Sequence, residues 1–313
     1  MSKRSYAIIG AGALGGYYGA RLVHAGHEVH FLLNRDYQEA KVSGLKVESP
    51  EGDFSIEKPN IYGCVEDMPK CDVVLVGLKT TSNHLLGDLL EAPLKEDGVV
   101  LVLQNGYGIE EEVAKIVGDD RVCGGLAFLC SNKVGPAHIK HLDYGIIRFG
   151  DYLPGEVAAG KTDRVVGLAG DFEAAGVPTE VEDDLVLARW KKLVWNVPYN
   201  GLSVVLHTTT DKIMQQADTR ALCLELMWEV VAGAKSSGRE IGEKFVELMM
   251  TNTDKMVAYK PSMLLDYEAG RPMEIDAIYG GPLRAAKAKG VALPRIEMLM
   301  QQLQYYDTLR VAD

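Results

Sequence analysis

A chain of 313 residues is long enough for two domains, and its 47% hydrophobic and 25% charged residues are typical of a globular protein. The formal net charge of −11 argues against nonspecific nucleic-acid binding, which needs a basic surface. The apolar run at the N-terminus is too short for a signal peptide, and no stretch reaches about 18 apolar residues. We therefore expect a cytoplasmic protein that partners neither nucleic acid nor a membrane.

The cysteine pattern points away from disulfides and metal. The five cysteines are odd in number and show no C-x-x-C spacing. We expect reduced core cysteines and no metal site.

The first predicted elements form a dinucleotide-binding unit. An apolar strand at 6–9 runs into Gly-x-Gly-x-x-Gly, which is followed by a helix at 13–24 and a strand at 28–33. The first glycine permits a tight turn, the second lets backbone approach a pyrophosphate, and the third lets helix and strand pack closely. The helix N-terminus offers N–H groups to the phosphates. The predicted cofactor-binding residues of this turn are Gly10, Gly12, Ala13, Leu14 and Gly15.

The residues after the second strand indicate which dinucleotide binds. An NAD enzyme typically carries an acidic residue there for the ribose 2′-hydroxyl. This sequence has Asn34 and Arg35, which suit a 2′-phosphate, so we predict NADP(H) over NAD(H). If the strand ends later, Asp36 takes the acidic role instead.

Two continuous apolar strands follow, at 72–78 and 99–103, as expected for a parallel sheet buried on both faces. Lys79 comes directly after the first strand, and Asn105 follows the second. Ligands lie at the carboxyl ends of such strands, so both residues are placed at the cofactor crevice. The alternatives are a surface charge at Lys79 and a simple Asn-Gly turn at Asn105.

The remaining pattern sets the fold class. Residues 44–61 read as a β-ribbon, and further strands are predicted at 121–130, 137–149 and 177–181, with a helix at 162–175. Beyond residue 184 helical periodicity takes over, at 188–197, 219–236, 243–257, 275–289 and 295–309. We predict an α/β protein: a Rossmann-type dinucleotide-binding domain at 1–183, followed by an all-helical substrate domain at 184–313.

Three polar residues share one face of the first helix in the second domain. Lys192, Asn196 and Asn200 are spaced by four, and apolar residues lie beside them, so the face is buried. Buried polar groups need partners, and we take the partner to be a small polar substrate. The alternative is a core helix whose lysine snorkels to solvent. Pro198 should interrupt this helix and bend its axis.

Two later residues are also candidates. Ser262 opens a short segment, where its simplest role is a helix N-cap. Glu274 precedes the next long helix, where an acid favours the first turn. Their combination with Lys192 favours a catalytic reading.

In order along the chain, these motifs resemble the ketopantoate reductase (2-dehydropantoate 2-reductase) family. The matching segments are Gly-x-Gly-Ala-Leu-Gly at 10–15, Leu-x-Asn-Gly at 103–106, Lys-x-x-x-Asn-x-x-x-Asn at 192–200, Ser-Met at 262–263 and Glu-Ile-Asp at 274–276. The resemblance implies NADPH-dependent reduction of ketopantoate to D-pantoate, a step towards pantothenate and coenzyme A.

The resemblance also implies a role for each residue. Lys192 would be the general acid, and Glu274 would orient and polarise the site. Asn196 and Asn200 would bind the substrate oxygens, and Ser262 its carboxylate. Asn105 would sit beside the nicotinamide and also bind the substrate, and Lys79 would border the cofactor crevice.

Two departures from the family pattern concern cofactor and substrate. The family's usual arginine at the end of the second strand is displaced by one position here, to Arg35 after Asn34. Pro198 and Tyr199 lie between Asn196 and Asn200. The alternatives are a reductase of another small 2-oxo acid and a non-catalytic nucleotide-binding regulator. A homodimer is the assembly we consider.

Overall fold

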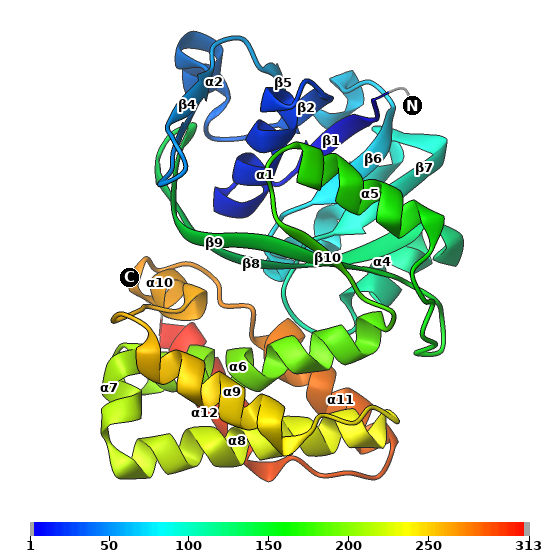
Figure 1. The fold of residues 1–313 in the computed structure, drawn as a ribbon. Helices are drawn as coiled ribbons and strands as arrows, with labels where there is room; N and C mark the ends of the chain where they lie inside the picture. The colour runs from blue at the N-terminus through cyan, green and yellow to red at the C-terminus, as the bar shows by residue number, and fades with distance from the viewer. Residues whose placement is uncertain (1–2, 310–313) are drawn as a thin grey trace. The chain divides into compact units, whose positions relative to one another are not determined.

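The chain divides into two compact units (Figure 1). The computed structural model describes residues 3–309. One unit comprises residues 3–104 and 109–185, and the other comprises residues 105–108 and 186–309. The four residues 105–108 follow a strand of the first unit yet group with the second, which the sequence did not predict.

The first unit is built on one ten-stranded sheet. Its strand order is β4-β3-β9-β8-β7-β6-β1-β2-β5, and β10 pairs with β9. All neighbours are parallel except β8 with β9 and β3 with β4. The strands are β1 (Ser5–Ile9), β2 (Glu28–Leu32), β3 (Leu45–Glu48), β4 (Phe54–Ile56), β5 (Asn60–Tyr62), β6 (Cys71–Val76), β7 (Leu94–Val102), β8 (Val122–Gly135), β9 (His138–Asp151) and β10 (Thr179–Val181).

Helices cover both faces of this sheet. The main core lies under α1 and α5, where Tyr18 and Phe172 pack against Ile8 and Phe31 of the central strands. On the other face α3 contacts α4, and Leu90 and Val113 are fully buried. The helices are α1 (Ala13–His24), α2 (Tyr37–Ser43), η1 (Val65–Asp67), η2 (Thr80–Leu85), α3 (Leu86–Glu91), α4 (Ile109–Val117), η3 (Asp119–Arg121) and α5 (Asp163–Ala174).

Two hairpins extend the parallel core. The predicted β-ribbon is the β3–β4 hairpin. The β8–β9 hairpin is longer than predicted, because its antiparallel pairing continues through three irregularities to Gly135 and His138. Its tip thereby reaches the end of β2, where it contributes to the nucleotide cavity described below.

The second unit is helical, as predicted. Its core contains Trp190, Leu193 and Val197 from the first helix, packed with residues of every later helix. The helices are α6 (Leu185–Val205), α7 (Thr210–Gln215), α8 (Ala217–Ser236), α9 (Glu243–Lys255), α10 (Ser262–Glu268), the π-helix η4 (Asp276–Gly280), α11 (Gly281–Ala288) and α12 (Pro294–Leu309). The predicted fold class, a Rossmann-type unit followed by a helical one, is confirmed.

The helix break expected at Pro198 is wrong. Pro198 lies inside α6, which continues to Val205. A proline inside a helix costs about 3 kcal/mol. Val197 and Tyr199 on either side are fully buried, and the Tyr279 hydroxyl donates to the Val197 carbonyl at 2.9 Å. Tertiary packing and this hydrogen bond offset the cost.

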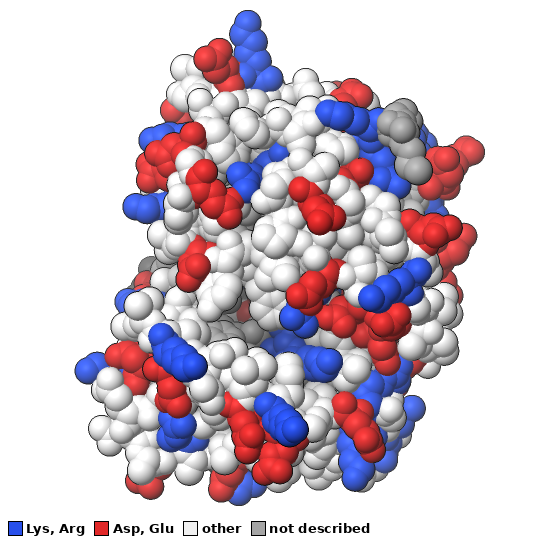
Figure 2. Space-filling model, in the orientation of Figure 1, with Lys and Arg blue, Asp and Glu red and all other residues white. Residues whose placement is uncertain are grey.

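The surface carries charges of both signs. On the face drawn in Figure 2, Lys and Arg are interspersed with Asp and Glu on each unit. Within residues 3–309, none of the helices is both long and apolar enough to span a bilayer.

Candidate functional site

The glycine-rich turn between β1 and α1 has the geometry of a phosphate cradle. Gly10 adopts φ +96°, and a Cβ there would lie 2.4 Å from the Leu78 backbone nitrogen. A Cβ on Gly15 would lie 2.3 Å from the Gly10 carbonyl oxygen, so strand and helix require both glycines. A Cβ on Gly12 would meet nothing within 4 Å. Gly12 therefore leaves open space at the start of α1, where a pyrophosphate can approach the backbone.

A cavity of about 440 Å³ opens beside this turn. Four predicted cofactor residues line it: Gly10, Gly12, Asn34 and Arg35. Ala13, Leu14 and Gly15 form the first turn of α1, and Lys79 follows the lining residue Leu78 without lining the cavity itself. The full lining is Ile9, Gly10, Ala11, Gly12, Leu32, Leu33, Asn34, Arg35, Asp36, Gly63, Val65, Leu78, Leu85, Leu89 and Lys133. The phosphate turn and the end of β2 meet at this cavity, as the pyrophosphate and adenosine part of a dinucleotide requires.

Asp36, the alternative acidic residue, lines the cavity with a carboxylate that already has partners within the protein. Strand β2 ends at Leu32, before Asn34. The Asp36 carboxylate accepts a hydrogen bond from the Ala137 N–H at 3.1 Å and pairs with the Lys133 ammonium. Lys133 was not predicted, because β8 brings it to this cavity from about a hundred positions further along the chain.

In the helical unit, α6 buries the three polar residues spaced by four. Lys192, Asn196 and Asn200 are 8%, 8% and 3% exposed. Burial lowers the pKa of Lys192 to about 7, with a further lowering by the Arg189 charge, while Glu274 raises it. A buried ammonium with this pKa can donate a proton near neutral pH. The snorkelling alternative is wrong, because the side chain is enclosed.

Arg189 is a second residue that the sequence reasoning missed. It is 2% exposed and lies three positions before Lys192, on the same side of α6. Its spacing of three residues from Lys192 could have indicated that it shares the buried side of the helix. Two cations and Glu274 thus share one buried electrostatic environment.

Asn200 connects α6 to the segment that carries Ser262. Its side-chain oxygen accepts a hydrogen bond from the buried Met263 N–H at 3.3 Å. Ser262 is the first residue of α10 and is half-buried, and the N-cap position is held by Pro261. The N-cap role considered for Ser262 is therefore wrong.

The loop at 105–108 packs on the segment that follows Glu274. The Tyr107 N–H donates to the Ala277 carbonyl at 2.9 Å. Gly106 adopts φ +118°, and a Cβ there would lie 2.5 Å from the same carbonyl oxygen. Glu274 is 5% exposed and lies two positions before the π-helix η4, a helix type that is frequent at functional sites. Asn105 is therefore anchored, through a glycine, to the segment that bears the acid.

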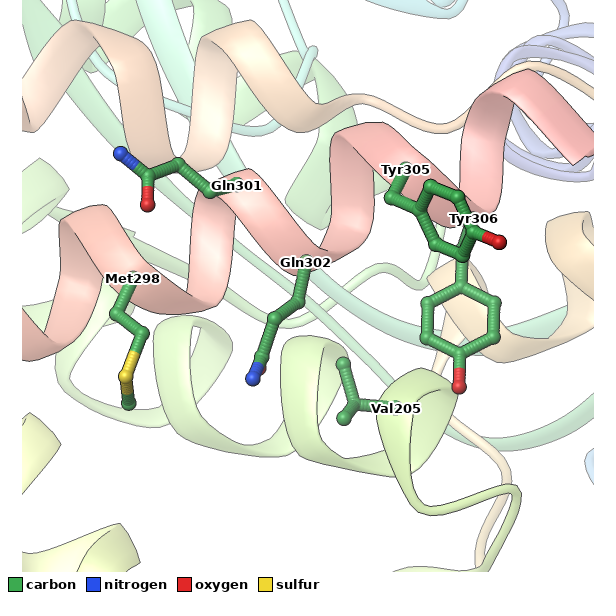
Figure 3. A pocket seen from close by; sticks show the side chains of 6 residues that line it. All are labelled: Val205, Met298, Gln301, Gln302, Tyr305 and Tyr306. Atoms are coloured by element: carbon green, nitrogen blue, oxygen red, sulfur yellow. The ribbon is translucent and has the colours of Figure 1, made fainter.

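A second cavity, of about 400 Å³, lies elsewhere on the helical unit. Five of its six lining residues belong to α12, and Val205 near the end of α6 is the sixth (Figure 3). The six are Val205, Met298, Gln301, Gln302, Tyr305 and Tyr306. It contains none of the predicted site residues and no charged group, so we assign no chemistry to it.

Within residues 3–309, no three or more His, Cys, Asp or Glu side chains gather so that they could hold a metal ion.

Comparison with known proteins identifies the family. The model "Ketopantoate reductase PanE/ApbA" matches residues 6–154, and its C-terminal counterpart matches residues 184–307. A 2-dehydropantoate 2-reductase from Nostoc sp. is 54% identical, over 98% of this chain and 96% of the relative. The crystal structure of a 2-dehydropantoate 2-reductase from Geobacter metallireducens is 44% identical, with a TM-score of 0.92, over 96% of this chain and 99% of that one.

A more distant structure shows how far the fold extends. D-mandelate dehydrogenase, in a ternary structure with NADH and anilino(oxo)acetate, is 22% identical, with a TM-score of 0.87, over 98% of this chain and 99% of that one. That likeness concerns the fold alone. The two family models together match most of the sequence, and the 2-dehydropantoate 2-reductases above are close relatives. The chain therefore belongs to the ketopantoate reductase family.

Proposed function

We propose that the protein catalyses NADPH-dependent reduction of 2-dehydropantoate (ketopantoate) to D-pantoate, in pantothenate and coenzyme A synthesis. The observation that carries the proposal is the buried Lys192, whose pKa is lowered to about 7 by burial and by the Arg189 charge, against the opposing effect of Glu274. Membership of the family supports the reaction. The residue roles that follow are our proposal.

Lys192 acts as the general acid. The bound NADPH supplies a hydride to the ketone carbon, and negative charge then grows on the ketone oxygen. The Lys192 ammonium stabilises that charge and gives its proton to the oxygen. Glu274 keeps the lysine protonated before the reaction, since its charge raises the pKa that burial lowers.

The remaining polar groups bind the substrate. Asn196 shares the buried face of α6 with Lys192 and binds substrate oxygens. Asn200 both binds the substrate and orders the start of α10 through Met263. Ser262, one position earlier and half-buried, donates to the substrate carboxylate.

The cofactor is held by the sheet unit. We assign the pyrophosphate to the turn formed by Gly10, Gly12, Ala13, Leu14 and Gly15. We assign the adenosine ribose to the cavity edge at Asn34 and Arg35. Lys79 borders the crevice, and Asn105 lies beside the nicotinamide. These assignments rest on the position of each residue after its strand.

The wider assignments belong to the same proposal. The functional domains are 1–183 and 184–313, close to the division between the compact units at 185. A cytoplasmic location is in line with five free cysteines. The reaction uses no metal and no nucleic-acid or membrane partner. The homodimer remains a prediction, which light scattering would test.

A substrate panel tests the reaction. NADPH oxidation would be followed by absorbance with ketopantoate, pyruvate, 2-oxoisovalerate and phenylglyoxylate. We expect the highest kcat/KM with ketopantoate. A folded, NADPH-binding enzyme that prefers another 2-oxo acid would contradict the substrate assignment. The assignment to the reductase class would still hold. The absence of turnover with every oxo acid would favour the non-catalytic regulator.

A further inference from the structure

The nucleotide cavity has a cationic edge assembled from two distant parts of the chain. Arg35 follows β2, and Lys133 lies near the end of β8. Both line the cavity of about 440 Å³ that also contains Gly10 and Gly12 of the phosphate turn. Nothing in the glycine fingerprint calls for Lys133.

Two contacts of Asp36 hold the β8–β9 hairpin, and with it Lys133, at this edge. The Lys133 ammonium pairs with the Asp36 carboxylate, and the same carboxylate accepts from the Ala137 N–H at 3.1 Å. Lys133 lies near the end of β8, and Ala137 lies in the turn between β8 and β9. The tip is thus attached at two points to the residue that follows Arg35.

The charges at this edge suit a phosphate better than a hydroxyl. Asp36 is 6% exposed, and both of its contacts use the same oxygen, Oδ2. The paired lysine offsets the carboxylate charge, which would otherwise repel a phosphate and attract a ribose hydroxyl. Arg35 adds a second cation, so the edge presents two cationic donors and a net positive charge.

The location matches where an adenosine ribose binds. In dinucleotide-binding units the 2′-position lies beside the residues that follow the second strand. In this chain those residues are Asn34, Arg35 and Asp36, and Lys133 faces them from β8.

We propose that Lys133 is a specificity residue, which together with Arg35 clamps the 2′-phosphate of NADPH while Asp36 holds the lysine in place. This inference rests on the proposed NADPH-dependent function and adds a residue to it. The lysine contributes to the choice of NADPH over NADH, and not to hydride or proton transfer.

The direct test is equilibrium binding of nucleotide fragments that differ by the 2′-phosphate alone. Calorimetry would compare adenosine 2′,5′-bisphosphate with 5′-AMP. We expect the wild type to bind the bisphosphate more tightly than 5′-AMP. In Lys133→Met the ratio of the two Kd values should fall roughly tenfold, as expected for the loss of one charge-assisted contact. Binding of 5′-AMP should stay the same. Lys133→Arg should keep most of the preference.

Two further variants control for charge and folding. Lys140→Met removes a lysine from the neighbouring strand β9 that does not line the cavity, and it should keep the full preference. The double variant Asp36→Asn/Lys133→Met removes both members of the ion pair, so no buried carboxylate is left unpaired. It should lose the preference as Lys133→Met does.

An unchanged preference in Lys133→Met and in the double variant would overturn the clamp. Equal binding of both nucleotides by the wild type would also overturn it. The proposed reaction is checked separately: ketopantoate turnover with NADH as the only reductant would show that the reductase stands without the clamp. A folded enzyme that reduces ketopantoate with neither NADH nor NADPH would count against the function itself.

Discussion

The glycine cradle at residues 10–15 and the proposed substrate face are built in opposite ways. The proposed substrate face comprises Lys192, Asn196, Asn200, Ser262 and Glu274. The cradle is mainly backbone: a turn at Gly10, open space at Gly12 and a close helix–strand contact at Gly15, all within six consecutive residues. The substrate face consists of side chains whose charges are buried, and its groups come from α6, α10 and the segment before η4. A backbone site fails when a side chain is added, whereas a side-chain site fails when a charge is lost.

This difference predicts different responses to mutation. An added side chain in the cradle should weaken nucleotide binding, and it should also destabilise the fold where its Cβ would meet backbone. A change on the substrate face should leave folding nearly intact and alter the pH dependence, the rate or the substrate KM. The first predictions below each test one side of that contrast, and the last tests the scaffold outside both sites.

Gly15→Ala should have the largest effect on stability. Its Cβ would lie 2.3 Å from the Gly10 carbonyl oxygen, so backbone must move, and we expect a loss of about 3 kcal/mol or more. Gly12→Ala is the matched control, because its Cβ meets nothing within 4 Å. It should unfold within about 1 kcal/mol of wild type yet bind NADPH more weakly. Urea unfolding measures the stability of both variants, and calorimetry measures their affinity for NADPH. Equal stabilities for the two variants would contradict the packing argument.

Glu274→Gln and Arg189→Gln should shift the pH profile in opposite directions. The acid must be protonated, so the rate falls as pH rises through the pKa of Lys192. Glu274 raises that pKa and Arg189 lowers it. The falling limb of kcat/KM, which reports the free enzyme, should therefore move to lower pH in Glu274→Gln and to higher pH in Arg189→Gln, by roughly one pH unit each, or tenfold at a fixed pH on that limb. Shifts in the same direction would refute the assignment of the limb to Lys192.

Asn200→Ala should raise the KM for ketopantoate. The change removes the acceptor of the buried Met263 N–H and loosens the start of α10, where Ser262 lies. One such hydrogen bond corresponds to roughly five- to tenfold in KM. Ser203→Ala is the control, because its hydroxyl donates to the Asn200 backbone carbonyl at 3.0 Å without touching the side chain. Steady-state kinetics should show an unchanged KM for Ser203→Ala; a rise equal to that of Asn200→Ala would mean that the loss is general loosening of α6.

Tyr279→Phe should have the smallest effect, and it should fall on stability alone. The variant loses the hydrogen bond to the Val197 carbonyl, worth about 1 kcal/mol. We expect a small drop in the free energy of unfolding and an unchanged kcat. A large loss of kcat would mean that Tyr279 belongs to the active site, and it would contradict the purely structural role proposed for its hydroxyl.

The same contrast explains what the sequence could predict. The cradle lies within one short segment, so its glycines identified both the turn and the fold class. The periodic Lys192, Asn196 and Asn200 likewise predicted the buried face of α6, because helical spacing is local. Lys133 could not be predicted as a cavity residue, because the β8–β9 hairpin brings it there from a distant part of the chain. Local sequence patterns do not contain that relation.

The remaining misses also have physical causes. Pro198 stays helical because burial around it outweighs its local preference. Ser262 follows the N-cap instead of being one, since helix ends are set by backbone geometry that residue type alone does not fix. Asn105 was placed after its strand, but its grouping with the helical unit depends on Gly106 fitting against Ala277.

The central claim is that the buried Lys192 supplies the proton. The most direct measurement is single-turnover oxidation of bound NADPH with saturating ketopantoate, for wild type and Lys192→Ala, across pH 6 to 9. We expect the wild-type rate to fall as pH rises above about 7, and the variant to be roughly 10²- to 10⁴-fold slower with no such limb while still binding NADPH. A variant that oxidises NADPH as fast as the wild type, with the same pH dependence, would contradict the account.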